Sequence, residues 1–168
     1  MEKLLDWVEK NAQENLRFRL QNAESLAKDS AAALAIALAG MGGALAFGAK
    51  AMENGVITPF IAGSIGTSAW LALCAALIVL RCIQCRDLEA PANEPRNLFQ
   101  PQYDLNVLRE VELENIQARI EKTNIRNHSV AYWLDRCRLI LAATPIIFLV
   151  GFLCKVAADH VAQVLAGG

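Results

Sequence analysis

A run of twenty residues without a charged side chain, from Ser30 to Ala49, constrains this chain more than any other feature. As an α-helix rising 1.5 Å per residue it is about 30 Å long, which matches the hydrocarbon core of a bilayer. Alanine and leucine dominate the run, and both favour helix over strand. We therefore predict a membrane-spanning helix here.

Two further apolar runs have the same character. Val56–Leu80 is uncharged and carries Pro59 in its first turn, where a missing N–H costs little. Leu139–Cys154 has sixteen residues, so a full crossing must extend beyond Lys155, whose ammonium group would reach outward to water. The sequence thus predicts an all-α integral membrane protein with three transmembrane helices and long cytoplasmic helical extensions.

Composition excludes several other classes. Hydrophobic residues make up 55% of the 168 and the mean hydropathy is +0.30, which is more apolar than a soluble one-core domain usually is. Aromatic residues are only 7%, which argues against an all-β fold. The net charge of −1 provides no field to attract nucleic acid, so we expect no nucleic-acid partner.

The basic residues predict the orientation. Fourteen of the sixteen precede Ser30 or lie between Arg81 and Arg138, and only Lys50 and Lys155 lie elsewhere. Positive charge marks the cytoplasmic side. We therefore expect a bacterial inner membrane protein with a cytoplasmic N-terminus and a periplasmic C-terminus.

Five segments follow from these patterns. They are a cytoplasmic N-terminal helix (1–29), a two-helix transmembrane hairpin (30–83), a cytoplasmic proline-rich loop (84–102), a long cytoplasmic helix (103–138), and a third transmembrane helix with a short periplasmic tail (139–168). Because no proline falls between Tyr103 and Pro145, the long helix is predicted to continue straight into the third crossing.

A heptad stripe runs along the long helix, with alternating spacings of three and four. We predict it to be an oligomer seam formed by Leu113, Ile116, Ile120, Asn127, Val130 and Leu134, with Thr123 and Cys137 in the same stripe. The competing interpretation is packing within the chain, against a similar stripe of Leu5, Val8, Leu16 and Leu20 in the N-terminal helix. A buried Asn127 facing its own copy would set register and oligomer state.

Small residues recur at helical spacing within the first two crossings. The predicted helix-packing positions are Gly40, Ala44, Gly48, Gly63 and Gly66. Small side chains let helix backbones approach closely in lipid. Alanine-rich helices also produce such spacings by chance, so the alternative is a lipid-facing surface.

Three cysteines gather at the predicted cytoplasmic ends of the second and third crossings: Cys82, Cys85 and Cys137. They are candidates for metal binding or redox chemistry, but zinc usually takes four ligands, and His128 is more than two helical turns from Cys137. Packing of small side chains at an interface is the favoured interpretation. We predict neither a cofactor nor a metal.

The densest basic cluster of the long helix consists of Arg119, Lys122 and Arg126. One interpretation is a cytoplasmic surface for a soluble protein partner or an anionic small-molecule signal. The alternative is an ordinary solvated helix face, because charges of alternating sign are common on exposed helices.

Catalytic and transport motifs are missing from the sequence. It has no phosphate-binding glycine loop, no H-E-x-x-H and no G-x-S-x-G, so we do not expect an enzyme. No charged residue occupies the centre of a crossing, which argues against an ion-coupled transporter.

The layout resembles a known class of proteins. An N-terminal helix with Ala23–Asp29 leads into a small-residue-rich crossing, and a loop entered near Tyr103 precedes a long charged helix and a last crossing. This is similar to the small multi-pass membrane effectors of bacterial antiphage signalling systems, of the Pycsar and SLATT type. The resemblance implies a protein that impairs the inner membrane when a nucleotide signal is made after infection.

Together these observations lead to the hypothesis of a homo-oligomeric, membrane-perturbing or channel-like effector. The alternative is an accessory subunit or scaffold that docks a soluble partner through its cytoplasmic helices. A holin or small toxin is a third class, but such proteins usually lack so long a cytoplasmic segment.

Overall fold

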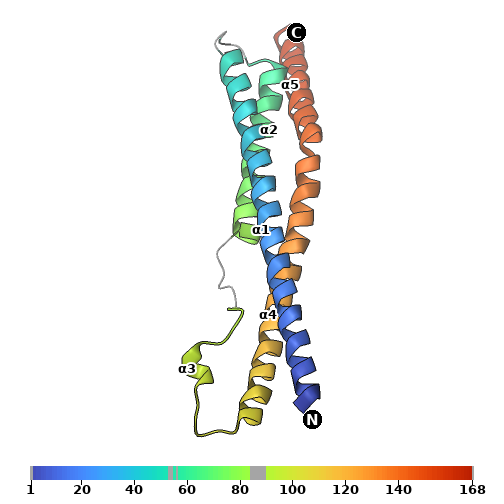
Figure 1. Ribbon diagram of the computed structural model, residues 1–168. Helices are drawn as coiled ribbons and strands as arrows, with labels where there is room; N and C mark the ends of the chain where they lie inside the picture. Colours follow the sequence, from blue (N-terminus) through green and yellow to red (C-terminus); the bar gives the residue numbers. More distant parts are fainter. Residues whose placement is uncertain (1, 53–54, 56, 84–89, 168) are drawn as a thin grey trace. The chain divides into compact units, whose positions relative to one another are not determined.

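The computed structural model describes residues 2–52, 55, 57–83 and 90–167. All regular structure in these ranges is helical, which confirms the all-α prediction (Figure 1). The elements are α1 (Glu2–Met52), α2 (Pro59–Ile78), a π-helical turn η1 (Val79–Ile83), α3 (Pro95–Leu98), α4 (Leu105–Ala142) and α5 (Thr144–Gly167).

The chain divides into two compact units, each built from segments distant in sequence. We call the first, Met1–Lys28 with Cys85–Tyr132, the polar unit. We call the second, Asp29–Gln84 with Trp133–Gly168, the apolar unit. Helices α1 and α4 each contribute to both units.

In the polar unit, α1 and α4 pair in parallel. Near their starts, Arg109 binds the carboxylates of Asp6 and Glu9, with 2.7 Å between Arg109 Nε and Glu9 Oε1. These hydrogen bonds, that of Glu9 foremost, raise the pKa of Arg109. Further along, Leu16 packs with Ile116 and Ile120 in the buried core, flanked by Ala12 and Leu20. Residues further along α1 contact residues further along α4, so the two helices run in the same direction.

In the apolar unit, α2 and α5 lie side by side and antiparallel (Figure 1). Phe60 at the start of α2 meets Phe152 edge to face, with ring centroids 5.1 Å apart, and also contacts Phe148. Ten residues later on α2, Trp70 reaches Ile140, which precedes α5. Aromatic contacts of this kind add to the burial of apolar surface.

The turn between α1 and α2 follows local sequence signals. Gly55 has φ of 73°, a left-handed conformation that glycine adopts without steric cost, and its N–H donates to Met52 O. Thr58 caps α2 by accepting from the Ile61 N–H, and Pro59 occupies the first turn as predicted.

The long helix enters the third apolar run as expected, because α4 passes Leu139 and ends at Ala142. The run is then interrupted at one residue, and α5 begins at Thr144. The cause is Pro145, which lacks an N–H and whose ring clashes with the carbonyl one turn earlier. The proline-rich loop also contains a short helix, α3, begun by Pro95.

Three helices are long and apolar enough to cross a membrane: Lys3–Met52, Pro59–Ile83 and Thr144–Gly167. Nearly half of the apolar window of the second is buried within the protein, whereas none of the third is. Large apolar side chains therefore face outward along α5, among them Ile146 and Leu153, each about 60% exposed. A surface of this size is typical of helices covered by lipid.

Candidate functional site

Two glycines, Gly63 on α2 and Gly151 on α5, make a close helix contact in the apolar unit. A Cβ atom added to Gly63 would lie 2.9 Å from Phe148 Cε2 and 3.0 Å from the Phe148 carbonyl oxygen. One added to Gly151 would lie 3.1 Å from Ala62 O and from Gly63 Cα. Only residues without side chains allow the two backbones to come this close.

The other predicted packing positions have different surroundings. Gly40 faces Leu71, whose Cδ1 would lie 3.0 Å from an added Cβ, and Gly48 faces Ser64 at 3.8 Å. Ala44 is half-buried. Gly66 has open space around it, so it does not mediate a close contact.

Sequence reasoning missed Gly151, the partner of Gly63. Its only signal was a single glycine between Phe148 and Phe152 in the third apolar run, a position without the four-residue repeat of small residues.

Two side chains donate hydrogen bonds to backbone carbonyls at the break before α5. Thr144 Oγ1 donates to Leu141 O at 2.6 Å. In a regular helix this carbonyl would accept from residue 145, but proline has no N–H to donate. Trp70 Nε1 donates to Ile140 O at 3.2 Å, from the neighbouring helix α2. Ile140 O also accepts from the Ala143 N–H at 3.2 Å, so Trp70 is its second donor.

The hydroxyl groups of α2 are bonded within their own helix. Ser64 donates to Phe60 O, Thr67 to Gly63 O and Ser68 to Ser64 O, at 2.9 to 3.0 Å. All three residues are buried. They offer no free polar groups to a transmembrane path through one chain.

Two of the three predicted cysteines come together. Cys82 in η1 hydrogen-bonds Cys137 of α4 and Ser30 of α1, and all three residues are buried. Burial raises the pKa of the Cys137 thiol. Cys85 lies outside the described residues, and the described part of the chain has no group of three residues that could hold a metal ion.

The predicted oligomer seam is buried within a single chain. Ile116 and Ile120 pack on Leu16, while Leu113 is half-buried. Asn127 Nδ2 donates to the Arg19 carbonyl at 2.9 Å. Val130, Leu134, Thr123 and Cys137 are also buried. The structure thus has the intramolecular arrangement that the sequence left open, and self-association stays a prediction that needs another surface.

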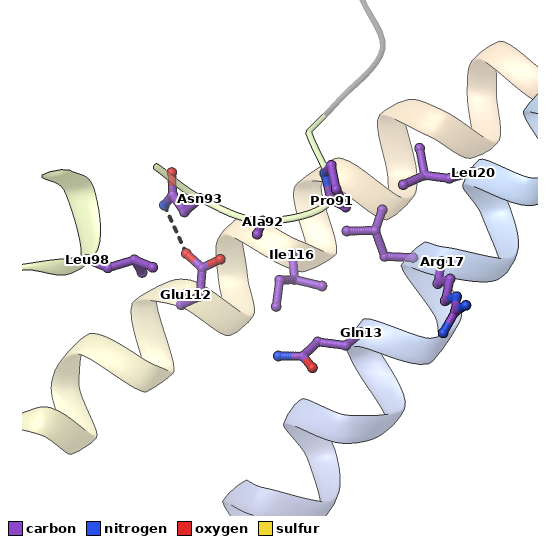
Figure 2. Close-up of a pocket in the computed structure, with 10 residues that line it drawn as sticks. Gln13, Arg17, Leu20, Pro91, Ala92, Asn93, Leu98, Glu112 and Ile116 are labelled. Carbon is purple, nitrogen blue, oxygen red and sulfur yellow. Dashed lines mark hydrogen bonds between the residues drawn. The ribbon is translucent and has the colours of Figure 1, made fainter. Parts of the chain in front are cut away.

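Glu112 of α4 accepts hydrogen bonds from two polar side chains of the polar unit. Its Oε1 accepts from Arg119 Nη2 at 2.8 Å and its Oε2 from Asn93 Nδ2 at 2.9 Å. Figure 2 shows the second bond, which ties the segment after residue 90 to α4.

Two pockets border this hydrogen-bonded group. One, of about 500 Å³, lies beneath Pro91 and Ala92 and is lined by α1 and α4, with Gln13 and Ile116 among its walls (Figure 2). The other, of about 570 Å³, is lined by Asn93, Asn97, Asn115, Ala118, Arg119 and Lys122. The second pocket contains two members of the predicted basic cluster, Arg119 and Lys122, whereas Arg126 does not line it.

Comparisons with known protein families, with curated proteins and with solved structures find no match for this chain. Fold and sites define its class: an all-α protein with three helices that are candidates to span a membrane. The resemblance to antiphage membrane effectors stays a prediction from architecture.

Proposed function

We propose that this protein is a non-enzymatic bacterial inner membrane effector that self-associates and perturbs the membrane or conducts through an assembled pore. The observation that carries this proposal is α5, a 24-residue apolar helix with no buried residue. Such a surface needs lipid, other copies of the chain, or both.

The hydroxyl groups of α2 are the reason that the proposal includes association of several copies of the chain. Ser64, Thr67 and Ser68 use their donors within the helix, so a polar route would have to form between copies. The architectural resemblance to antiphage effectors supports a role in defence against phage.

Controlled expression in bacterial cells tests the proposal. We expect the wild-type chain to depolarise the inner membrane, measured with a potential-sensitive dye. Gly151→Leu should abolish the effect because it separates α2 from α5, whereas Gly66→Ala, which meets open space, should retain it. Wild-type protein that is inserted at a normal level yet leaves the potential unchanged contradicts the proposal.

A second candidate function is a scaffold that docks a soluble partner. The observation that favours it is the set of large apolar side chains exposed on the polar unit: Trp7 and Phe18 at 64%, and Ile125 at 71%. Exposed aromatic residues are enriched at protein interfaces. A scaffold would be inert alone and would form a stoichiometric complex that Trp7→Ser disrupts.

A further inference from the structure

An ion pair lines a pocket between α1 and α4 in the apolar unit. Arg138 Nη2 donates to Asp29 Oδ2 at 2.9 Å, and both side chains are half exposed. The pocket has a volume of about 270 Å³, and both charged residues form part of its wall. Because an exposed ion pair contributes little to stability, its two groups can accept a further partner at little cost.

The rest of the pocket wall is apolar. It consists of Ala32, Ala33 and Ile36 of α1 and Leu141 of α4. Ile36 follows Asp29 by seven residues, which is about 10 Å along a helix. The Ile36 side chain is 67% exposed, so the apolar wall is open to the surroundings of the protein. The pocket therefore changes from charged to apolar along α1.

This change coincides with the start of two apolar runs. Asp29 is the last charged residue before the run that begins at Ser30, and Arg138 is the last before the run that begins at Leu139. In a membrane, the charged end of the pocket would lie among the headgroups and the apolar end within the hydrocarbon. A phospholipid has the same order, with a charged headgroup followed by apolar chains.

The charges at the pocket favour a headgroup that carries both signs. Arg138 contacts two carboxylates, because Asp135 Oδ1 lies 3.6 Å from its Nη1, in addition to the bond with Asp29. Two carboxylates and one guanidinium leave an excess of one negative charge, which disfavours a purely anionic lipid. A headgroup with a phosphate and a primary ammonium group would give each charge an opposite partner.

We propose that this pocket binds one molecule of phosphatidylethanolamine. The phosphate accepts hydrogen bonds from Arg138, the ammonium group donates to Asp29, and part of one acyl chain lies along Ile36 and Leu141. Phosphatidylglycerol lacks the ammonium group, and the quaternary ammonium of phosphatidylcholine has no N–H to donate. The site rests on the membrane location of the chain but not on the proposed effector activity.

Native mass spectrometry of the full chain tests the proposal. The chain is purified in a neutral detergent, stripped of lipid and offered equal amounts of phosphatidylethanolamine, phosphatidylglycerol and phosphatidylcholine with identical acyl chains. We expect one molecule of phosphatidylethanolamine to be retained, with a preference of at least about fivefold over each of the others, as for charge-assisted hydrogen bonds that only this headgroup completes. Equal retention of the three lipids, or a preference for phosphatidylglycerol, overturns the proposal.

Charge variants test the two halves of the headgroup separately. Arg138→Gln should reduce the retention of phosphatidylethanolamine at least about fivefold, because the phosphate loses its charged donor. Asp29→Asn removes both the acceptor for the ammonium group and the excess negative charge, so the preference over phosphatidylglycerol should fall to about twofold or less. The matched control is Glu24→Gln, which breaks an exposed ion pair of α1 with Lys28, outside the pocket. Its lipid preference should stay within about twofold of the wild type.

A third variant protects the test from a folding defect. Ala32→Phe fills the pocket from an exposed position and leaves every charge in place. It should abolish the lipid preference, with an unchanged unfolding temperature in detergent. An unchanged preference for this variant, or equal losses for Asp29→Asn and Glu24→Gln, overturns the proposal.

The lipid measurement and the depolarisation measurement have separate outcomes. A chain that depolarises cells but shows no lipid preference keeps the proposed function and loses this site. A chain that retains phosphatidylethanolamine selectively but leaves the membrane potential unchanged keeps the site and loses the proposed function.

Discussion

Trp70 Nε1 donates a hydrogen bond to the backbone carbonyl of Ile140, across the contact between α2 and the end of α4. The bond lies where Pro145 interrupts the helix, so a side chain takes over part of what the backbone ladder supplies elsewhere. This relationship links the bend in one helix to the identity of one residue in another.

The first prediction follows from this bond. Trp70→Phe should destabilise the protein by about 1 kcal/mol, because Ile140 O loses one of its two donors and keeps the Ala143 N–H. Unfolding in a denaturing detergent series measures the change. In the Pro145→Ala background the same substitution should cost less, since a regular helix supplies its own donors. Equal losses of stability in both backgrounds would show that the Trp70 bond does not depend on the helix break at Pro145.

A second prediction concerns the glycine contact. Gly63→Ala and Gly151→Ala should each destabilise the apolar unit by about 1 to 3 kcal/mol, because the new methyl group meets backbone atoms. Gly66→Ala is the matched control and should be neutral or stabilising by up to about 1 kcal/mol, as expected for glycine replaced in a helix. Thermal unfolding in one detergent compares the three. A control as damaging as the other two would argue against the contact.

The third prediction uses Asn127, which donates to Arg19 O within the chain. Asn127→Leu should change stability by no more than about 1 kcal/mol, since one hydrogen bond is exchanged for apolar burial. The distribution of oligomers in native mass spectrometry should remain that of the wild type. A shifted distribution would instead place this residue at an interface between copies.

The fourth prediction concerns topology. With three candidate membrane spans, the asymmetry of basic residues predicts a periplasmic reporter after Gly168 and a cytoplasmic reporter near Asn93. Paired alkaline phosphatase and fluorescent protein fusions measure both positions. If the two reporters lie on the same side, α5 does not cross.

A fifth prediction concerns the reactivity of Cys137. Burial disfavours its thiolate and raises its pKa, while the hydrogen bond with Cys82 acts in the opposite direction. Alkylation by N-ethylmaleimide should therefore be slower than in the unfolded chain and should stay slow near pH 8.5, where an ordinary thiol is half ionised. Mass spectrometry of the labelled peptide gives the rate.

The same shift predicts the direction of a change in stability. The unfolded thiol ionises at a lower pH than the folded one, so this contribution is complete below about pH 8.5 and is lost as the pH rises further. Cys137→Ser should reduce the alkaline loss of stability. Equal labelling rates in the folded and unfolded chain would show that the thiol is accessible.

The sequence alone was sufficient for the helical class and the three apolar helices. Both depend on local properties, namely the length of uncharged runs and the preference of alanine and leucine for helix. The cap at Thr58 and Pro59 is likewise set by neighbours a few residues apart.

Tertiary structure decided which residues meet. The heptad stripe with Ile116 and Asn127 was visible in the sequence, but periodicity cannot tell a partner in the same chain from one in another copy. Gly151 carried almost no pattern, and its role appears only where Gly63 lies against it. Such outcomes depend on distances between segments far apart in the chain, which local chemistry does not encode.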